Sequence, residues 1–272
     1  MRVMIIRLLI LTMVFLCAFT TTASAATVSG LKTSYSPNDN ISVDYEADIA
    51  KGVLNICVTG SDNDFSLGIF KNDERYSYRL KPGEKAAIPF NMGNGAYNVK
   101  LFLYVGETTA VQLWETTFFI GLESENAPYL NPSKMVKWTG DSALAEAAKN
   151  LAVKDDPEKT ALEICKFISK RYSFDKSITS VPAWYVPDLA AVYENSTGIC
   201  YDYAALYTAM CRSVGIPTKM VFGYSPYVGM SQYHAWCLVL IDGKWRPIDP
   251  IYSMTHGAKF LDMGKSVQVR QY

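Results

Sequence analysis

Histidine is scarce in this 272-residue chain, which has two, His234 and His256. Cysteine is also scarce, with six residues, and no Cys-x-x-Cys pair occurs, so the spacing typical of zinc fingers and redox dithiols is missing. His234 and Cys237 lie an odd number of residues apart on an expected strand, so their side chains point to opposite faces. We therefore expect neither a metal site nor a cofactor.

Neither sign of charge is in excess. The chain has 26 Lys and Arg residues against 26 Asp and Glu, and the loss of Arg2 and Arg7 with the leader described below leaves 24 against 26. Both signs are mixed along the sequence, which lacks the basic stretches typical of nucleic-acid binding. We expect no nucleic-acid partner.

One long hydrophobic run is present, at the start of the chain. Arg2 and Arg7 precede an apolar stretch from Leu8 to Phe19, and Ala23-Ser24-Ala25 follows, which is the order of a secretory signal. The apolar stretch is shorter than the roughly 18 residues of a membrane-spanning helix, although an uncleaved anchor is the alternative. We predict a signal peptide over residues 1–25, a secreted or cell-envelope-exposed protein, and no membrane span after signal removal.

The remaining cysteines do not form a recognisable disulfide framework. Five follow the leader, an odd number without tight spacing, so at least one thiol should stay free. Cys165, Cys211 and Cys237 lie within apolar periods and are expected to pack in the core. The five residues are Cys57, Cys165, Cys200, Cys211 and Cys237.

Residues 26–122 carry the signals of strands. Ile41, Val43 and Tyr45 alternate with polar residues, and turn chemistry such as Lys81-Pro82-Gly83 separates the runs. No helical period appears between them. We predict an antiparallel β-sandwich of roughly seven strands, immunoglobulin-like in style.

The spacing of apolar residues changes from the alternation of strands to a helical period after the polar segment 123–134. This segment holds two prolines and is the predicted linker. Residues 135–272 then form the predicted second domain. Its helices begin near Asp141 or Ser142, at Asp156-Pro157 and after Gly198. Its strands are expected over residues 219–224, 234–241 and 244–248.

Cys200 lies where the chain enters the third of these helices. Unpaired amides and the helix dipole at a helix N-terminus favour a thiolate, the form that a cysteine nucleophile needs. The alternative is a buried, inert cysteine that acts as a small apolar side chain. The residues that accompany Cys200 decide between the two.

The expected hairpin brings a histidine and a carboxylate together. Asp242-Gly243 is a strong two-residue turn signal, so Ile241 should face Lys244, and counting back places residue 236 opposite Asp249. His234 then lies on the same face and diagonally across from Asp249, within reach of a hydrogen bond. An imidazole and its orienting carboxylate require this geometry. His256, in an expected loop without a carboxylate in register, is the alternative base.

Several motifs resemble, in order and spacing, the core of the transglutaminase-like superfamily. They are Gly198-Ile-Cys-Tyr-Asp, Ser213-Val-Gly-Ile-Pro, Gly223-Tyr, His234-Ala-Trp and Trp245-Arg-Pro-Ile-Asp-Pro, and the match covers roughly residues 135–252. The resemblance implies an α+β fold: a papain-like transglutaminase core, with helices packed on a small antiparallel sheet, preceded here by the N-terminal antiparallel β-sandwich. It also implies that Cys200 is the nucleophile, His234 the general acid/base and Asp249 the residue that orients the histidine.

This resemblance implies a cysteine peptidase or acyltransferase that acts on a peptide or protein, such as a cell-envelope peptide. The Cys200 thiolate would form a thioester, which water or an amine would resolve. The oxyanion would meet the Cys200 backbone amide and a second donor, for which Tyr172 and Trp184 are candidates, although either ring could simply pack. Asp202 is interpreted as support for the helix start.

A binding module without catalytic activity is the competing hypothesis. In that case the fold would be retained while exposed aromatic side chains of the sandwich bind a partner. Tyr76, Tyr78 and Trp114 are the candidates for such a surface, and their alternative place is the sandwich core. The presence of Cys200, His234 and Asp249 favours the enzyme.

Overall fold

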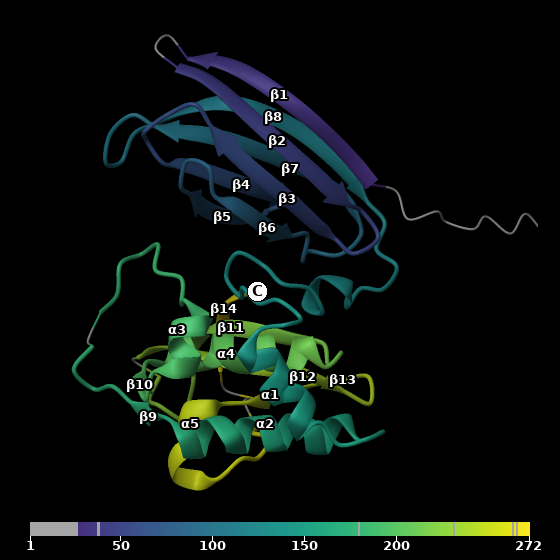
Figure 1. The fold of residues 1–272 in the computed structure, drawn as a ribbon, viewed down its shortest axis with the longest axis vertical. Coiled ribbons are helices and arrows are strands. Elements are labelled where there is room, and N and C mark those ends of the chain that lie inside the picture. The colour runs from purple at the N-terminus through teal and green to yellow at the C-terminus, as the bar shows by residue number, and fades with distance from the viewer. Residues whose placement is uncertain (1–26, 37–38, 179, 231, 263, 265) are drawn as a thin grey trace, which may run out of the picture.

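A computed structural model describes residues 27–36, 39–178, 180–230, 232–262, 264 and 266–272. In the described part of the chain, eight strands, β1–β8, stand above a second unit of helices and strands (Figure 1). The fold is therefore an N-terminal antiparallel β-sandwich followed by an α+β core, as the sequence predicted. The predicted signal peptide lies outside the described residues. Within the described part of the chain, no helix is both long and apolar enough to cross a membrane.

The sandwich consists of two four-stranded antiparallel sheets, with strand orders β1-β2-β3-β6 and β5-β4-β7-β8. The sequence predicted roughly seven strands, and the structure has eight; β6 is short and has one large apolar side chain, Ile88, so its pattern is weak. The strands are β1 (Thr27–Ser36), β2 (Asp39–Asp48), β3 (Val53–Thr59), β4 (Phe65–Lys71), β5 (Glu74–Leu80), β6 (Lys85–Pro89), β7 (Gly95–Tyr104) and β8 (Ala110–Ile120).

The inner faces of the two sheets form an apolar core. Alternate residues of β7 are buried, as the pattern in the sequence requires. Tyr76, Tyr78 and Trp114 belong to this core, because their exposed fractions are 8%, 2% and 8%. These three aromatic side chains offer no exposed binding surface.

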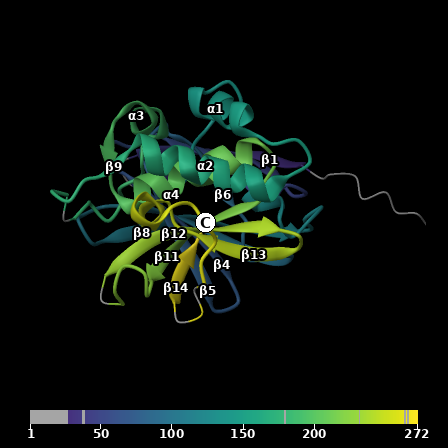
Figure 2. The same cartoon turned by 90° about the horizontal axis from the view of Figure 1, so that it is seen from below.

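The core that follows places helices on one side of a four-stranded antiparallel sheet of order β13-β12-β11-β14 (Figure 2). A separate two-residue parallel pair is formed by β9 (Ser173–Phe174) and β10 (Thr197–Gly198). The remaining elements are η1 (Ala127–Tyr129), α1 (Ala143–Leu151), α2 (Pro157–Arg171), α3 (Leu189–Glu194), α4 (Cys200–Ser213), β11 (Thr218–Tyr224), β12 (Tyr233–Ile241), β13 (Lys244–Ile248), α5 (Pro250–His256) and β14 (Val267–Gln271).

Helix α4 is the centre of this core. Residues 201–212 are all buried, and the helix packs against α1, α2 and α3 on one side and against β11 and β12 on the other. Helix α2, by contrast, buries a single stripe along one face and begins at Asp156, whose carboxylate accepts a hydrogen bond from the Lys159 amide. A helix enclosed in this way holds its first residue, Cys200, in a fixed place.

The buried guanidinium of Arg212 joins three segments. It donates to the carbonyl oxygens of Thr218, Asn131 and Tyr272 at 2.9, 2.9 and 3.0 Å. The Tyr272 ring packs edge-on against Tyr76 of the sandwich, with ring centroids 5.5 Å apart. These contacts tie α4 to the segment before the core, to β11 and to the sandwich.

Candidate active site

The start of α4 is fixed from two directions. Gly198, the second residue of β10, pairs with Phe174, and the Ile199 amide donates to Asp202 Oδ2 at 2.8 Å. Residue 198 has to be small, because a Cβ atom there would lie 2.9 Å from that carboxylate oxygen. Cys200 follows as the first residue of the helix and is half-buried. The backbone thus presents Cys200 at a helix N-terminus, as the sequence predicted.

Asp202 has a second partner that the sequence did not reveal. Its Oδ1 accepts a hydrogen bond of 2.6 Å from the hydroxyl of Tyr185, whose ring packs edge-on against Tyr201 at 5.7 Å. The interpretation of Asp202 as support for the helix start is therefore correct. Tyr185 lies in the loop before α3, far from α4 in sequence, and no local pattern marks it.

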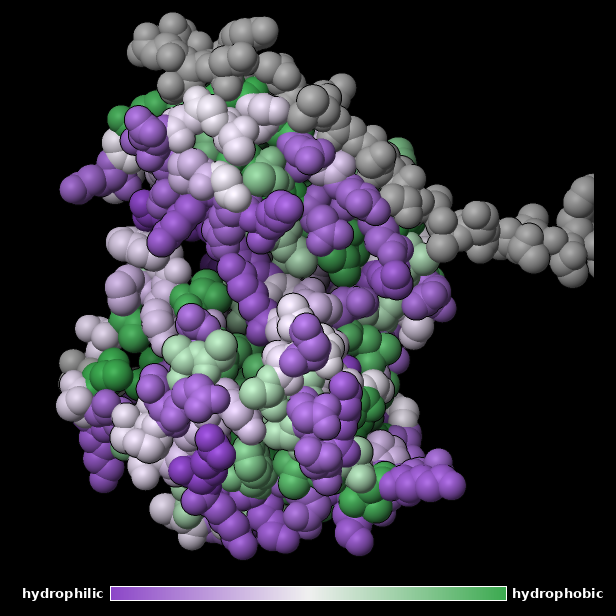
Figure 3. Space-filling view, viewed as in Figure 1, coloured by the Kyte–Doolittle hydropathy of each residue, from purple (hydrophilic) through white to green (hydrophobic). Residues whose placement is uncertain are grey.

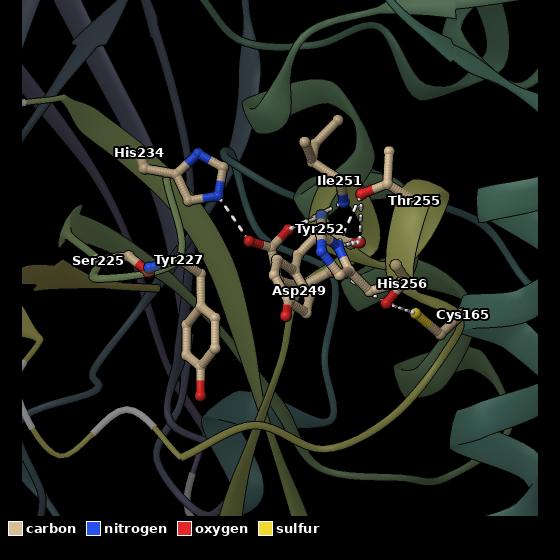
Figure 4. Close-up of polar contacts among 10 residues, drawn as sticks. Cys165, Ser225, Tyr227, His234, Asp249, Ile251, Tyr252, Thr255 and His256 are labelled. Atoms are coloured by element: carbon tan, nitrogen blue, oxygen red, sulfur yellow. Dashed lines mark hydrogen bonds and ion pairs between the residues drawn. The ribbon is translucent and has the colours of Figure 1, made fainter. Parts of the chain in front are cut away.

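The hairpin has the predicted register. Ile241 pairs with Lys244 and Cys237 pairs with Ile248, which places Asp249 next along the strand opposite residue 236. His234 Nε2 lies 2.8 Å from Asp249 Oδ2 (Figure 4). The predicted diagonal contact is present.

Asp249 also begins a helix, α5, that the sequence did not predict. Its Oδ1 accepts hydrogen bonds from the amides of Ile251 and Tyr252, at 2.9 and 3.2 Å, so one carboxylate caps α5 and contacts His234 (Figure 4). The side chain is fully buried, with an exposed fraction of 0%. Three hydrogen bonds therefore fix the orientation of the carboxylate against the imidazole.

The environment of His234 favours its protonated form. Burial alone would lower the pKa of the imidazole, but the hydrogen bond with Asp249, the proximity of the Cys200 thiol and the charges of both partners raise that pKa to about 10. The structure thus brings Cys200, His234 and Asp249 close together. Because Nε2 is engaged with Asp249, Nδ1 is the ring nitrogen left for the thiol.

Gly223 allows β14 to approach β11, the strand that pairs with the strand of His234. It pairs with His234 across β11 and β12, and a Cβ atom at residue 223 would lie 2.0 Å from the Val267 carbonyl oxygen of β14. Trp236, two residues along β12, lies nearly parallel to the imidazole, with ring centroids 6.4 Å apart. The sheet can therefore hold His234 and β14 together only with glycine at this position.

Three further cysteines, Cys165, Cys211 and Cys237, lie buried in the core. Burial raises the pKa of Cys165 and of Cys211 to about 12, and it raises that of Cys237 well above its ordinary value. These three thiols are packing residues, as expected. Cys57, in the sandwich, is half-buried.

His256 stands apart from the group formed by His234 and Asp249. The sequence predicted a loop at His256, but the residue is the last of α5, and its ring stacks on Tyr252 at 4.0 Å. Its Nδ1 contacts the hydroxyl of Thr255 at 2.7 Å. These contacts engage its ring within α5.

The two candidates for a second oxyanion donor are placed elsewhere. The Tyr172 hydroxyl donates to the Tyr193 carbonyl oxygen at 2.8 Å, and its ring is buried. Trp184 is 58% exposed and lies over the guanidinium of Arg79, 4.5 Å from the ring centroid. Both rings therefore make packing contacts, which is the alternative that the sequence left open for them.

Comparison with known proteins agrees with this geometry. Residues 145–250 match the family model described as the transglutaminase-like superfamily. The segment belongs to that superfamily. The matched segment holds Cys200, His234 and Asp249, while the sandwich lies outside it. A comparison with curated proteins gave no match.

Among solved structures, a candidate cysteine protease from Cytophaga hutchinsonii is 17% identical, with a TM-score of 0.44, over 81% of this chain and 75% of that chain. The periplasmic domain of TgpA from Pseudomonas aeruginosa is 14% identical, with a TM-score of 0.38, over 85% and 99%. Red sea bream transglutaminase is 12% identical, with a TM-score of 0.33, over 88% of this chain and 50% of that chain.

Proposed function

We propose that this transglutaminase-like protein is a cysteine-dependent amide or peptide hydrolase, or an acyl transferase, in which Cys200, His234 and Asp249 carry the reaction. The observation that carries the proposal is the position of the His234 imidazole, buried between a thiol at a helix N-terminus and a carboxylate that accepts three hydrogen bonds. Such an arrangement is what activated cysteine nucleophiles use.

In the proposed reaction, the Cys200 sulfur attacks the carbonyl carbon of an amide and forms a C–S bond. The negative charge that develops on the carbonyl oxygen is met by the backbone amide of Cys200 at the start of α4. His234 gives its proton to the leaving nitrogen as the C–N bond breaks, and a free amine departs. The Asp249 carboxylate stabilises the imidazolium and holds the ring in place throughout.

The resulting thioester is then resolved by water or by a second amine. His234, now neutral, takes a proton from the incoming nucleophile, the C–S bond breaks, and the thiolate–imidazolium pair is restored. Water gives a peptidase or amidase, and an amine gives a crosslinking enzyme. The proposed substrate in both cases is a peptide or protein, and no cofactor takes part.

We extend the proposal to the rest of the chain. The leader sequence supports removal of residues 1–25 and a protein exposed outside the cytoplasm, where an envelope peptide is a suitable substrate. The proposed domains are 26–122, an immunoglobulin-like sandwich, and 135–272, the catalytic domain, joined by residues 123–134. The strand orders β2-β3-β6 and β5-β4-β7-β8 support the immunoglobulin-like assignment, because they follow A-B-E and C′-C-F-G once β1 is set aside.

The first experiment measures the rate of Cys200 alkylation by iodoacetamide against pH. We expect rapid alkylation already near pH 6 in the native chain and loss of that reactivity in His234→Ala, because the imidazolium stabilises the thiolate. Cys200→Ala identifies the labelled residue, and His256→Ala is the matched control, which should leave the profile unchanged. A rate that rises only near the free-thiol pKa of about 8.5, and is the same in His234→Ala, would refute the proposed pair.

A further inference from the structure

A substrate of the proposed reaction needs a surface to lie on, and two parts of the described surface are candidates. The larger is the hollow between the sandwich and the core, with a volume of about 880 Å³ (Figure 3). Four basic and four acidic side chains line it, and Cys200, His234 and Asp249 are not among its lining residues. This hollow favours neither sign of charge, and the reacting groups lie outside it. The second surface consists of aromatic rings beside Cys200 and His234.

Tyr233 belongs to the sheet face that carries the nucleophile helix α4. Side chains alternate along β12, so Tyr233 and Cys237 point to the same face of the sheet. Cys237 Sγ donates to the Ala204 carbonyl oxygen of α4 at 3.3 Å, which identifies this face as the one that α4 covers. Both elements begin close to this contact, β12 at Tyr233 and α4 at Cys200.

A row of rings runs from the residue after Cys200 to the residue before His234. Tyr201 packs edge-on against Phe222, with ring centroids 4.8 Å apart. Phe222 in turn lies nearly parallel to Tyr233, with centroids 6.1 Å apart and 14° between the ring planes. The starts of α4 and β12 therefore lie at the same end of the sheet, and Tyr233 stands beside Cys200 and His234.

The rings become more exposed along this row. Tyr201 is buried, Phe222 is half-buried, and Tyr233 is 52% exposed. Tyr224 packs edge-on against Tyr233, with centroids 5.6 Å apart, so two neighbouring rings fix the orientation of the exposed one. A ring that packing already holds in place loses little conformational entropy when a ligand contacts it. Tyr233 therefore presents a rigid aromatic surface to solvent.

We propose that Tyr233 is a specificity-determining residue, whose exposed ring contacts an apolar or aromatic side chain of the peptide next to the amide that Cys200 attacks. The identification of the ligand as a peptide rests on the proposed function. Consecutive Cα atoms of a peptide lie about 3.8 Å apart, so the residues that flank this amide lie over the surface around Cys200. An uncharged aromatic ring there contacts apolar groups and other rings favourably.

The test compares two alkylating reagents on the full chain. Iodoacetamide and N-benzyl-iodoacetamide carry the same reactive carbon, from which the Cys200 thiolate displaces iodide, and the second reagent adds a ring beyond its amide. Mass spectrometry of the peptide that contains Cys200 gives each rate. The ratio of the two rates is divided by the same ratio for free N-acetylcysteine. We expect the protein to favour the benzyl reagent by about threefold to tenfold.

Substitutions of Tyr233 locate the contact. Tyr233→Ala should reduce the benzyl preference to that of the free thiol, whereas Tyr233→Phe keeps the ring and should retain the preference. Phe119→Ala is the matched control, because it removes a ring that is 77% exposed on β8 of the sandwich, and it should leave the preference unchanged.

A second measurement needs no variant. N-acetyl-phenylalanine amide should slow the alkylation of Cys200 by iodoacetamide in the native chain, at concentrations at which N-acetyl-alanine amide has no effect. The two compounds differ by one aromatic ring, so the difference between them reports a contact of that ring beside Cys200.

An equal ratio in the protein and the free thiol, or loss of the benzyl preference in Phe119→Ala as well as in Tyr233→Ala, would overturn the proposal. Protection of Cys200 by an N-acetylglucosamine oligosaccharide, without a benzyl preference, would assign the ring to a glycan and overturn it as well. Failure of the proposed function is distinguishable, because a thiolate that does not form slows both reagents equally and leaves their ratio unchanged.

Discussion

The sandwich and the core differ in how they treat polar side chains. Between residues 41 and 132, the part of the sandwich and linker whose burial is described, Asn91 is the only buried residue that is neither apolar nor aromatic, and its Nδ2 donates to the backbone oxygen of Gln271 of the core. The core buries Asp202, Arg212, His234 and Asp249, each with hydrogen bonds. Burial of a polar group costs free energy unless hydrogen-bond partners replace water. The sandwich therefore gains its stability from apolar contacts, whereas the core buries polar groups at the candidate active site and where it contacts other segments.

In this comparison of the core with the sandwich, we expect the largest effect from a substitution at the candidate active site. Asp249→Asn keeps the shape of the side chain but removes the charge that raises the pKa of His234, so the imidazole should lose its proton at lower pH. We expect the rate of Cys200 alkylation at pH 6 to fall by about 100-fold to 10,000-fold. Asp44→Asn in the sandwich is the control, and an equal fall in both variants would contradict the assignment.

Removal of the buried arginine should cause the largest loss of stability. Arg212→Met leaves the carbonyl oxygens of Asn131, Thr218 and Tyr272 without their donor, and we expect the free energy of unfolding to fall by about 3–5 kcal/mol. Arg79→Met in the sandwich, which breaks the more exposed pair with Asp64, should cost less than about 1 kcal/mol. Urea denaturation of both variants checks this; similar losses would contradict the contrast.

An acid-dependent effect is expected where the sandwich meets the core. Burial raises the pKa of Glu84, but hydrogen bonds from Lys134 and Lys137 outweigh it and lower the pKa from 4.5 to about 2. The folded-state pKa is depressed, so this contribution to stability is present above about pH 4.5 and is lost as pH falls toward 2.

The corresponding measurement compares native protein with Glu84→Gln in urea at several pH values. At pH 6 the variant should be less stable by about 1 kcal/mol, after allowance for solvent screening, and the difference should vanish near pH 2. Glu74→Gln, at an exposed residue of β5, serves as the control and should show no such convergence. A pH-independent difference for Glu84→Gln would exclude the ion pair as its cause.

The smallest expected effect is a difference in stability between two tyrosine variants, one in the core and one in the sandwich. Tyr185→Phe removes the donor to Asp202 and should lower the free energy of unfolding by about 1 kcal/mol. Tyr78→Phe removes a buried hydroxyl that has no partner in the described structure, so it should be neutral or stabilising. Thermal denaturation of the two variants in parallel gives the sign of each change, and a loss at Tyr78 equal to that at Tyr185 would contradict the comparison.

Local chemistry made much of the fold predictable. The Asp242-Gly243 turn set the register that brings His234 to Asp249, and alternation marked the strands of the sandwich. The position of Cys200 at the start of α4 followed from Gly198 and the apolar period behind it. The transglutaminase-like assignment was confirmed by the family match, whereas the catalytic roles of the three residues stay predictions.

Features that depend on distant contacts were missed or wrong. Helix α5 has seven residues, and its cap, Asp249, had already been assigned to the histidine. Strand β14 has its valines exposed, at 53% for Val267 and 52% for Val269, so no buried pattern marked it. Trp184 was a candidate donor to the oxyanion, but its ring contacts Arg79, which is distant in sequence. Tertiary partners of this kind leave no periodic signal.

The contacts of Arg212 also bear on the order in which the chain folds. They join α4 to residues 81 positions earlier and 60 positions later, and Asn91 reaches Gln271 across 180 positions. Contacts between distant parts of a sequence form late, because a large loop has to close before they contribute. The sandwich, built largely from strands that are neighbours in sequence, should therefore form first. A chain that is still folding would carry Cys200 without an ordered His234 beside it, and the proposed nucleophile would become reactive only when the core closes.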